Sequence, residues 1–497
     1  MRRILSGIIA TVLLLTGCSE NPPEVLKPEA GPKLLSSSPE NGATGLTGKE
    51  LTVKLTFDQN IKCPSAQQKT ISIDGGAAID KVTAFNAELS VKVSGLETDS
   101  GKTYTLNIPE GAVSGFKTNQ DPSDPIKLTF TMKYAEPYVP STLDPVKTLV
   151  NPDATPQAQS VYAFLCEQSG VKTLSGVQSS HSNRNDFVDA VARHTGKHPA
   201  LAGYDFIFTH YSPTPENWSW VQDYNDISAA KEQWSNNGLV SYMWHWNVPS
   251  SEAAWKNSLE NYGEFDGYAF YSDQTSFDIR EALKPGTWQN EFIMKDIEEV
   301  AGYLQLLEDE GIPVIWRPLH EAAGNYDLYE GGYGAWFWWG RGGAEPCKQL
   351  WRLLYDQLVN VHGLDNLIWV WTVDVPVGAE EHYLEWYPGD EYVDILGVDI
   401  YAADTEAKTR QYQALVDLVK GKKLVTISEC GNIPDPDKCM TEGNRWSWFM
   451  VWPSTDADGN VTLTSSDANF KLNTPAYWKQ VMSSQNVINR ENMPQLK

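Results

Sequence analysis

The 497-residue chain is short of basic residues, and this shortage excludes one class of partner. It holds 39 Lys and Arg against 64 Asp and Glu, a formal net charge of −25 at pH 7. A protein with this charge is repelled by phosphate backbones. We therefore exclude nucleic acid as a partner and expect a neutral or cationic one.

The chain also lacks an apolar run long enough to span a bilayer. The best candidate, residues 4–15, is shorter than the roughly 20 residues that a membrane helix needs. It follows Arg2 and Arg3, and a short apolar run behind basic residues is typical of an export signal. The run ends in LTGC (15–18), which resembles a bacterial lipobox with Cys18 as the lipidated residue; an ordinary signal peptide is the alternative.

These features predict the route of the chain through the cell. We expect residues 1–18 to be a lipoprotein signal peptide and residues 19–32, rich in Pro and Glu, to be a tether. The mature protein is then expected in the cell envelope, lipid-anchored to the outer membrane, on its surface or periplasmic face, and as a monomer.

Cysteine is scarce, and its pattern excludes a full disulfide framework. Five cysteines remain after Cys18, an odd number. Cys430 and Cys439 could bridge a loop, since export permits it, and buried thiols are the alternative. No Cys and His spacing indicates a zinc site, so we expect neither a metal nor a cofactor.

Residues 33–134 have the pattern of an all-β sandwich of the immunoglobulin-like type. Apolar and polar residues alternate in five segments, separated by Gly, Asn, Asp and Pro. The segments are LTVKLTF (51–57), TISI (70–73), LSVKV (89–93), TYTLNI (103–108) and IKLTFTM (126–132). The opening SPENGATGL (38–46) resembles bacterial immunoglobulin-like modules, for which we favour a spacer role over glycan binding.

After a predicted linker, residues 135–152, the pattern changes to alternating strands and helices and indicates a (β/α)₈ TIM barrel over residues 153–490. Several strands are nearly continuous apolar runs, as in parallel sheets covered on both faces. An open doubly wound sheet is the alternative, weakened because no Gly-rich loop follows the first strand. The eight predicted strands are residues 173–178, 198–206, 239–246, 312–321, 366–374, 393–402, 423–431 and 446–452.

Polar and aromatic residues end these strands, where the active sites of such barrels lie. Glu321 ends the fourth strand and Glu429 ends the seventh, so the two face each other across the mouth of a closed barrel. Glycoside cleavage needs two carboxyl groups flanking the scissile bond. We therefore predict Glu321 and Glu429 as a catalytic pair; a structural ion pair with Arg317 is the alternative.

Neighbouring strand ends supply the remaining candidates. Arg317 is expected inside the barrel, where it could orient carboxylates, and Tyr401 could donate a hydrogen bond to Glu429. Both are expected to bind substrate. The other predicted substrate-binding residues are His245, His320, Trp336, Trp371, Asp399 and Trp452.

WRPLHE (316–321), AWFWWG (335–340), VDILGVDIY (393–401) and SECG (428–431) together resemble glycoside hydrolase family 26 over about residues 150–490. The resemblance implies Glu321 as acid/base and Glu429 as nucleophile. It also implies that His245 and His320 contact the sugar in the −1 subsite, that Trp336 lines the site, and that Tyr401 touches the nucleophile.

The resemblance implies hydrolysis of β-1,4-mannan, glucomannan or galactomannan with retention; β-1,3-xylan or mixed-linkage β-glucan is the alternative substrate. A non-catalytic glycan-binding lipoprotein is a second alternative, and an adhesin a third. Residues 322–334 lengthen the loop after the fourth strand, where Tyr326, Tyr329 and Tyr333 could stack on sugar. This loop leaves endo action, which we favour, and exo action both open. The long aromatic segment 267–288 is predicted as another wall of the cleft.

Overall fold

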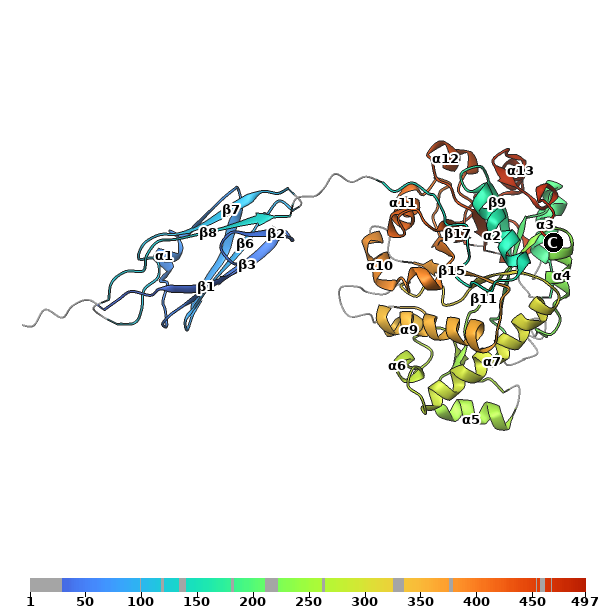
Figure 1. The fold of residues 1–497 in the computed structure, drawn as a ribbon, viewed down its shortest axis with the longest axis horizontal. Coiled ribbons are helices and arrows are strands. Elements are labelled where there is room, and N and C mark those ends of the chain that lie inside the picture. Colours follow the sequence, from blue (N-terminus) through green and yellow to red (C-terminus); the bar gives the residue numbers. More distant parts are fainter. Residues whose placement is uncertain are drawn as a thin grey trace, which may run out of the picture. The chain divides into compact units, whose positions relative to one another are not determined.

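The computed structural model describes residues 29–98, 100–117, 120–133, 140–179, 183–210, 222–261, 264–324, 335–374, 379–452, 454–455, 461–465 and 467–497. The predicted signal peptide, most of the predicted tether and Cys18 lie outside these residues. The chain divides into two compact units, residues 1–139 and 140–497 (Figure 1). Among the described helices, none combines the length and the apolar character that a membrane crossing requires.

The first unit is a β-sandwich, as the sequence predicts. One sheet has the strand order β1-β3-β6-β5 and the other β2-β8-β7-β4. Alternate side chains of β3 and β6, among them Val53, Leu55 and Val91, are buried between the sheets. The elements are β1 (Leu34–Ser38), β2 (Ala43–Leu46), β3 (Glu50–Phe57), α1 (Ser65–Gln68), β4 (Ser72–Asp74), β5 (Ala78–Phe85), β6 (Glu88–Ser94), β7 (Thr103–Ile108) and β8 (Ile126–Met132).

Three of these strands were not predicted from the sequence, and all three lie at sheet edges. They are β1, β2 and β5. An edge strand has a partner on one side only and can bury little; none of the side chains of β5 is fully buried. Its alternation of apolar and polar residues is therefore weak.

The second unit is a closed barrel of eight parallel strands, which confirms the predicted fold class. The strands follow in the order β10-β11-β14-β15-β16-β17-β18-β9, and β9 also pairs with β10 and closes the ring. This closure rules out the open doubly wound sheet. The barrel strands are β9 (Thr173–Gln178), β10 (Leu201–Asp205), β11 (Leu239–Met243), β14 (Val314–Arg317), β15 (Leu367–Val373), β16 (Ile395–Ile400), β17 (Leu424–Cys430) and β18 (Trp448–Val451).

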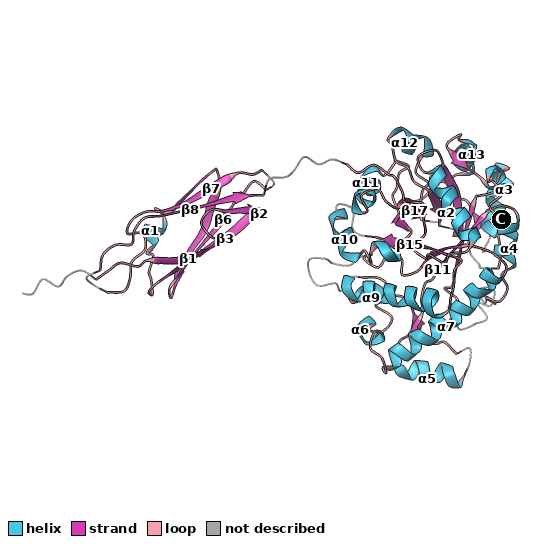
Figure 2. Ribbon diagram, viewed as in Figure 1, coloured by secondary structure: helices cyan, strands magenta, loops and turns pink. Residues whose placement is uncertain are grey.

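Helices surround this barrel (Figure 2). The α-helices are α2 (Pro156–Gln168), α3 (Asp186–Thr195), α4 (Ser228–Ser235), α5 (Glu252–Glu260), α6 (Ile279–Ala282), α7 (Trp288–Asp309), α8 (Trp338–Arg341), α9 (Ala344–Tyr355), α10 (Tyr383–Trp386), α11 (Thr409–Leu418), α12 (Pro436–Thr441) and α13 (Pro475–Ser483). Shorter elements are β12 (Val248–Pro249), β13 (Tyr268–Ala269), β19 (Ser454–Thr455), β20 (Val461–Thr462), β21 (Val487–Ile488), η2 (Asp356–Val361), η3 (Glu380–His382), η4 (Asp390–Tyr392) and η5 (Arg490–Asn492).

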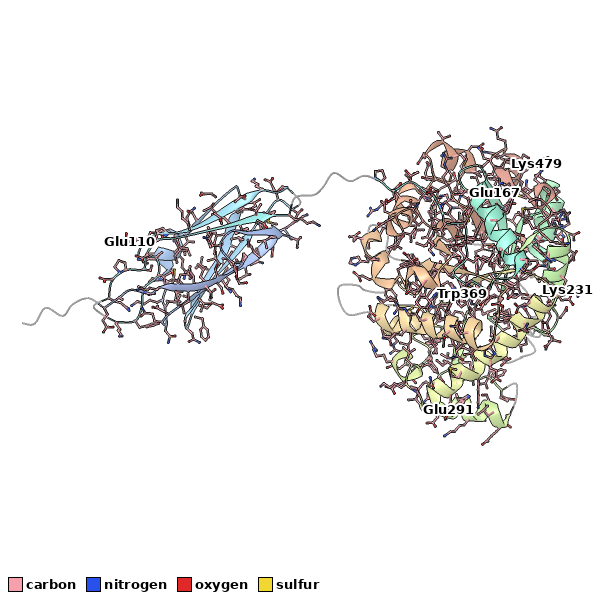
Figure 3. The ribbon with its side chains drawn as sticks, in the orientation of Figure 1. Glu110, Glu167, Lys231, Glu291, Trp369 and Lys479 are labelled. Carbon is pink, nitrogen blue, oxygen red and sulfur yellow. The ribbon has the colours of Figure 1, made fainter. Side chains whose placement is uncertain are left out.

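Local sequence explains why the helices form and which face they bury. Helix α9 buries Cys347, Leu350, Trp351 and Leu354, a stripe at helical spacing. The Trp369 side chain of β15 lies under this stripe, with its ring centroid 5.7 Å from that of Trp351. Figure 3 labels Trp369 within the unit, whereas the labelled Lys231, Glu291 and Lys479 lie at its rim.

Part of the predicted linker belongs to the barrel unit. The backbone N–H of Ser141 donates to Asp417 at 2.7 Å, and that of Val150 donates to Asp394 at 2.7 Å. Asp144 N–H donates to the carbonyl of Gly421 at 2.8 Å. The chain therefore packs on the barrel from about residue 140, before the predicted domain start at residue 153.

Candidate active site

Three carboxyl groups meet at the C-terminal ends of the barrel strands. Asp399 lies in β16, Glu429 lies in β17, and Glu321 follows β14. One oxygen of each lies within 4.8 Å of the others, and all three residues are buried. The two residues predicted as a catalytic pair are thus brought together across the mouth of the barrel.

Arg317 holds two of these carboxylates. It is the last residue of β14; one guanidinium nitrogen lies 2.9 Å from Oδ2 of Asp399, and another donates to Oε1 of Glu429. Burial opposes the charge of Arg317, but Asp399 and Glu429 outweigh burial and raise its pKa. Arg317 is therefore a fixed positive charge that orients the carboxylate of Glu429.

Tyr401 donates a second hydrogen bond to Glu429. Its hydroxyl lies 2.7 Å from Oε2 of Glu429, and its ring packs edge-on against Phe470 at 5.4 Å between centroids. The two oxygens of Glu429 therefore receive separate donors, Arg317 on one and Tyr401 on the other. The two donors therefore hold this carboxylate in one orientation.

Glu321 has the opposite environment. Burial raises its pKa well above that of an ordinary glutamate, and the charges of Asp399, Glu429 and Asp374 act in the same direction. Arg317 opposes this shift without cancelling it. Two carboxyl groups with divided environments are the usual arrangement of an acid beside a nucleophile. The raised pKa makes Glu321 suited to hold a proton.

Asp374 is a further acidic group at this site. It directly follows β15, and burial together with the charge of Glu429 raises its pKa to about 7. The site thus gathers four carboxyl groups, and three of them, Asp399, Glu429 and Glu321, act on the charge of Arg317. They cannot all be ionised at low cost, because like charges in a buried site repel.

Two histidines form a hydrogen-bonded pair beside Glu321. Nε2 of His245 and Nε2 of His320 are 3.2 Å apart, and both side chains are buried. Nδ1 of His245 lies 2.6 Å from Oδ2 of Asp205, the last residue of β10. Burial, His245 and Arg317 hold the pKa of His320 well below its usual range, so His320 is neutral.

Aromatic residues form the wall around these groups. The ring of Trp452, directly after β18, lies 5.8 Å from that of His245. Phe337 packs against both His245 and His320, at 5.5 and 5.3 Å. The half-buried Trp336 packs over Gly324, three residues after Glu321. Trp452 thus lies beside the histidine pair, and Trp336 lies over the segment that follows Glu321.

Trp371 does not lie in the site, and its predicted contact with sugar does not fit its position. Ile315 and Ile368 are register partners, as are Trp316 and Trp369, so each pair faces one side of the sheet. Trp369 faces helix α9, and Trp371, two residues on, faces the same way. Its ring packs against Tyr387 at 5.2 Å, in the layer between barrel and helices.

The backbone that carries Glu321 is strained. Leu319 and Glu321 have φ angles of 48° and 51°, in the left-handed region that costs a side chain about 1–2 kcal/mol. Strand β14 therefore ends at Arg317, earlier than predicted, and simple alternation does not apply to Glu321. The strained segment turns the Glu321 side chain into the mouth of the barrel.

The site could in principle hold a cation, since three carboxylates converge there. Arg317 already supplies a positive charge between Asp399 and Glu429, which is the role that a metal ion would otherwise take. A second group in the described part of the chain, His210, Asp296 and Glu299, forms an internal ion pair instead, with His210 Nε2 2.6 Å from Asp296.

The structure does not describe the three predicted loop tyrosines, but it does describe the two cysteines that could have formed a disulfide. Tyr326, Tyr329 and Tyr333 lie outside the described residues. Cys430 and Cys439 are separate, buried thiols, so the structure favours the thiol alternative.

The sequence reasoning missed several residues of the site, among them Asp205 and Tyr271. Asp205 ends the second barrel strand, and the rule that strand ends carry the chemistry could have found it. Tyr271 is 43% exposed, its ring stacks on that of Phe337 at 5.9 Å, and the charge of Glu321 contributes to its raised pKa after burial. Only its segment, 267–288, was predicted as a wall of the cleft.

Comparisons with known proteins agree with this geometry. Residues 150–472 match the model of glycosyl hydrolase family 26, and residues 28–132 match that of a bacterial Ig-like domain. A mannan endo-1,4-beta-mannosidase of Thermothelomyces thermophilus is 37% identical over 344 residues, 69% of this chain and 62% of that protein. Mannan endo-1,4-beta-mannosidase B of Piromyces sp is 34% identical over 72% of this chain and 55% of its own length. The chain thus spans less than two thirds of these curated relatives.

Solved structures of mannanases are also similar to this chain. The beta-mannanase from a symbiotic protist of the termite Reticulitermes speratus, in complex with gluco-manno-oligosaccharide, is 33% identical with a TM-score of 0.57, over 71% of this chain and 99% of that one. The corresponding domain of an endo-beta-mannanase/endo-beta-glucanase from Prevotella bryantii is 34% identical with a TM-score of 0.59, over 70% of this chain and 100% of that one.

Proposed function

Because the chain belongs to glycosyl hydrolase family 26, we propose that it is a retaining glycoside hydrolase that cleaves β-1,4-mannosidic linkages. One observation carries the proposal: oxygens of Glu321 and Glu429 lie within 4.8 Å of each other at the mouth of the barrel. Retaining enzymes hold their two carboxyl groups roughly 5–5.5 Å apart, whereas inverting enzymes need roughly 6.5–9.5 Å to admit a water.

The reaction proceeds in two displacements. In the first, Glu321 gives its proton to the glycosidic oxygen while the carboxylate of Glu429 attacks the anomeric carbon, and the leaving chain departs with that proton. In the second, Glu321 takes a proton from water, whose oxygen attacks the anomeric carbon and releases Glu429. The raised pKa of Glu321 and the two donors on Glu429 support this division of roles.

The substrate is inferred from the relatives. The curated proteins bear the name mannan endo-1,4-beta-mannosidase, and the termite protist enzyme was solved with gluco-manno-oligosaccharide. We infer endo cleavage of mannan, glucomannan or galactomannan, with His245, His320, Trp336, Trp452, Tyr401 and Asp399 lining the −1 region. β-1,3-Xylan and mixed-linkage β-glucan are the competing substrates.

A substrate panel with a nucleophile variant tests the function. Wild type and Glu429→Gln are incubated with β-1,4-mannan, β-1,3-xylan and mixed-linkage glucan, and new reducing ends are measured. We expect turnover of mannan by wild type and a loss of at least about 10⁴-fold in Glu429→Gln. Glu491→Gln, which removes a carboxylate paired with His198 outside the site, is the matched control and should keep full activity.

Two further readouts of the same reaction would contradict the proposal. The anomeric form of the first product, followed by NMR before mutarotation, should be β; an α product means inversion. Early products should form a ladder of sizes, as endo cleavage requires, and a single small product means exo cleavage. Binding of mannan by wild type without turnover would indicate the non-catalytic glycan-binding alternative.

We further propose that cleavage after Gly17 removes the signal peptide and that Cys18, then the first residue, carries the lipid that anchors the protein to the outer membrane. The LTGC motif (15–18) supports this, and the immunoglobulin-like domain then serves as a spacer for a monomeric enzyme. Cys18→Ser should release the protein from the membrane fraction of an expressing Gram-negative cell. Retention of that variant in the membrane fraction would contradict the anchor.

A further inference from the structure

Asp205 makes a two-point contact with one residue, His245. Its Oδ1 accepts the backbone N–H of His245 at 3.0 Å, and its Oδ2 lies 2.6 Å from Nδ1 of the same ring. Both residues are buried. The strand end that carries Asp205 is itself held, because the Tyr224 hydroxyl donates to its carbonyl at 2.8 Å. The imidazole of His245 is therefore fixed in one orientation.

The contact also fixes where the proton of His245 lies. A carboxylate only accepts hydrogen bonds, so Nδ1 of His245 carries a hydrogen. In neutral His245 this leaves Nε2 as an acceptor, and that atom faces Nε2 of His320 at 3.2 Å. One hydrogen lies between the two Nε2 atoms, and it must be bonded to Nε2 of His320.

The arrangement also fixes the tautomer of His320. This residue is neutral, because burial depresses its pKa, so donating from Nε2 leaves its Nδ1 as an acceptor. His320 directly precedes Glu321, and its carbonyl accepts the Trp339 indole N–H at 2.8 Å. The tautomer of His320 thus decides whether its buried Nδ1, which has no hydrogen-bond partner among the described residues, is a donor or an acceptor.

We propose that Asp205 is a positioning residue for the proposed glycosidase reaction: through Nδ1 of His245 it fixes the tautomers and orientation of both active-site histidines. It touches neither substrate nor reacting atoms. The inference rests on the proposed function for its kinetic effect, but the tautomers themselves can be observed without it.

Asp205→Asn is the sharpest variant, because it keeps the shape and replaces one acceptor by a donor. The Asn Oδ1 still accepts the backbone N–H, while its NH₂ now faces Nδ1 of His245. His245 must then move its hydrogen to Nε2, where it meets the Nε2 hydrogen of His320. Two donors cannot bond, so His320 must also switch tautomer.

The first measurement is NMR of the full chain labelled with ¹⁵N-histidine, which reads the tautomer of each ring. The proposal expects His245 with Nδ1–H and His320 with Nε2–H in wild type, and the reverse in Asp205→Asn. A wild-type His245 that carries its hydrogen on Nε2 overturns the proposal, even if the variant fails to fold. This readout is independent of activity, so total inactivity of wild type on mannan would refute the proposed function alone.

The second measurement is a double-mutant cycle on mannan hydrolysis. Asp205→Asn should lower kcat/KM by roughly 10- to 100-fold, mostly in kcat. This loss is smaller than the loss of about 10⁴-fold that a wrong tautomer causes in a catalytic triad, where the histidine itself transfers the proton. In a His245→Ala background, Asp205→Asn should lower kcat/KM by less than about twofold, because the histidine through which Asp205 acts is absent. Equal losses in both backgrounds, or full activity of Asp205→Asn, overturn the proposal.

The chain supplies a matched control for this pair. Glu491 also accepts both the backbone N–H and Nδ1 of one histidine, His198, at 2.9 and 2.6 Å. His198 precedes β10, at the opposite end of the strand from Asp205. Glu491→Gln should therefore leave kcat/KM and both active-site tautomers unchanged. A loss equal to that of Asp205→Asn would mean that any such pair matters only for folding, and would overturn the proposal.

Discussion

At the scale of single residues, the buried Glu321 links the proposed activity to stability. Its pKa in the folded protein is raised, whereas in the unfolded chain a glutamate titrates near about 4.3. Between these two values the folded state binds the extra proton, so stability falls as pH rises through the window. Above the folded pKa, the full cost of the buried charge is present.

Glu321→Gln removes this cost, and we therefore expect it to stabilise the barrel at neutral pH while it abolishes mannan hydrolysis. Its melting temperature should exceed that of wild type at pH 7–8 and approach it near pH 4. Differential scanning calorimetry at several pH values measures the difference. A difference that does not change with pH would contradict the raised pKa.

The activity of wild type should also depend on whether Glu321 is protonated. Since Glu321 must be protonated to assist departure of the leaving chain, kcat/KM on mannan should fall as pH rises through its pKa. A β-mannobioside with a dinitrophenyl leaving group needs no acid, so Glu321→Gln should retain its first displacement on that substrate. Equal losses on both substrates would argue against Glu321 as the acid.

Tyr401 gives a third prediction at this scale. Tyr401→Phe removes the hydroxyl that donates to Oε2 of Glu429 at 2.7 Å but keeps the ring against Phe470. A hydrogen bond to a charged group contributes about 1.5–3 kcal/mol, so kcat/KM should fall roughly 10- to 100-fold. Thermal unfolding should shift little, and an unchanged kcat/KM would mean that Arg317 alone suffices.

At the scale of elements, the conformation of the segment after β14 depends on close contact between its backbone and the backbone of helix α8. A Cβ added to Gly340, in helix α8, would lie 1.9 Å from the carbonyl oxygen of Ala322, the residue after Glu321. Backbone atoms cannot yield as a flexible side chain can, so the collision must move α8 or the strained Glu321 segment.

Gly340→Ala should therefore destabilise the barrel by several °C in melting temperature and reduce activity. The matched control is Gly302→Ala in helix α7, where an added Cβ meets nothing within 4 Å. Gly302 is exposed in the helix, so alanine there should stabilise by about 0.5–1 kcal/mol. Chemical denaturation measures both, and equal effects of the two substitutions would contradict this assignment.

Elements also show how far sequence patterns reach. Several of the eight barrel strands are nearly continuous apolar runs between turn residues, so they were found from their own residues. Strands β1, β2 and β5 of the sandwich were missed, because none of them contains a fully buried residue that would mark an alternation. The same apolar runs conceal which side chains face inward, and this is why Trp371 was predicted as a substrate-binding residue although it faces outward.

At the scale of the whole molecule, the two units divide the work proposed for the chain. Residues 140–152 hydrogen-bond to the barrel unit although their composition is that of a linker. A truncated chain of residues 140–497 should hydrolyse soluble mannan with the kcat/KM of the full chain. A shorter chain of residues 153–497 should melt at a lower temperature, since it leaves Asp394 and Asp417 without these donors. Identical melting temperatures of the two truncated chains would mean that the segment is a free linker.

The sequence by itself determined the sandwich, the eight-stranded barrel and the residue types at the strand ends, because periodicity and strand order are written in local stretches of the chain. Only the tertiary structure decided the 4.8 Å limit between the carboxyl groups, the donors on Glu429, the pairing of Asp205 with His245 and the outward face of Trp371. These depend on how a closed barrel brings distant segments together, and on burial that shifts protons. No single stretch of residues encodes the relative position of distant segments or the burial of a side chain among them.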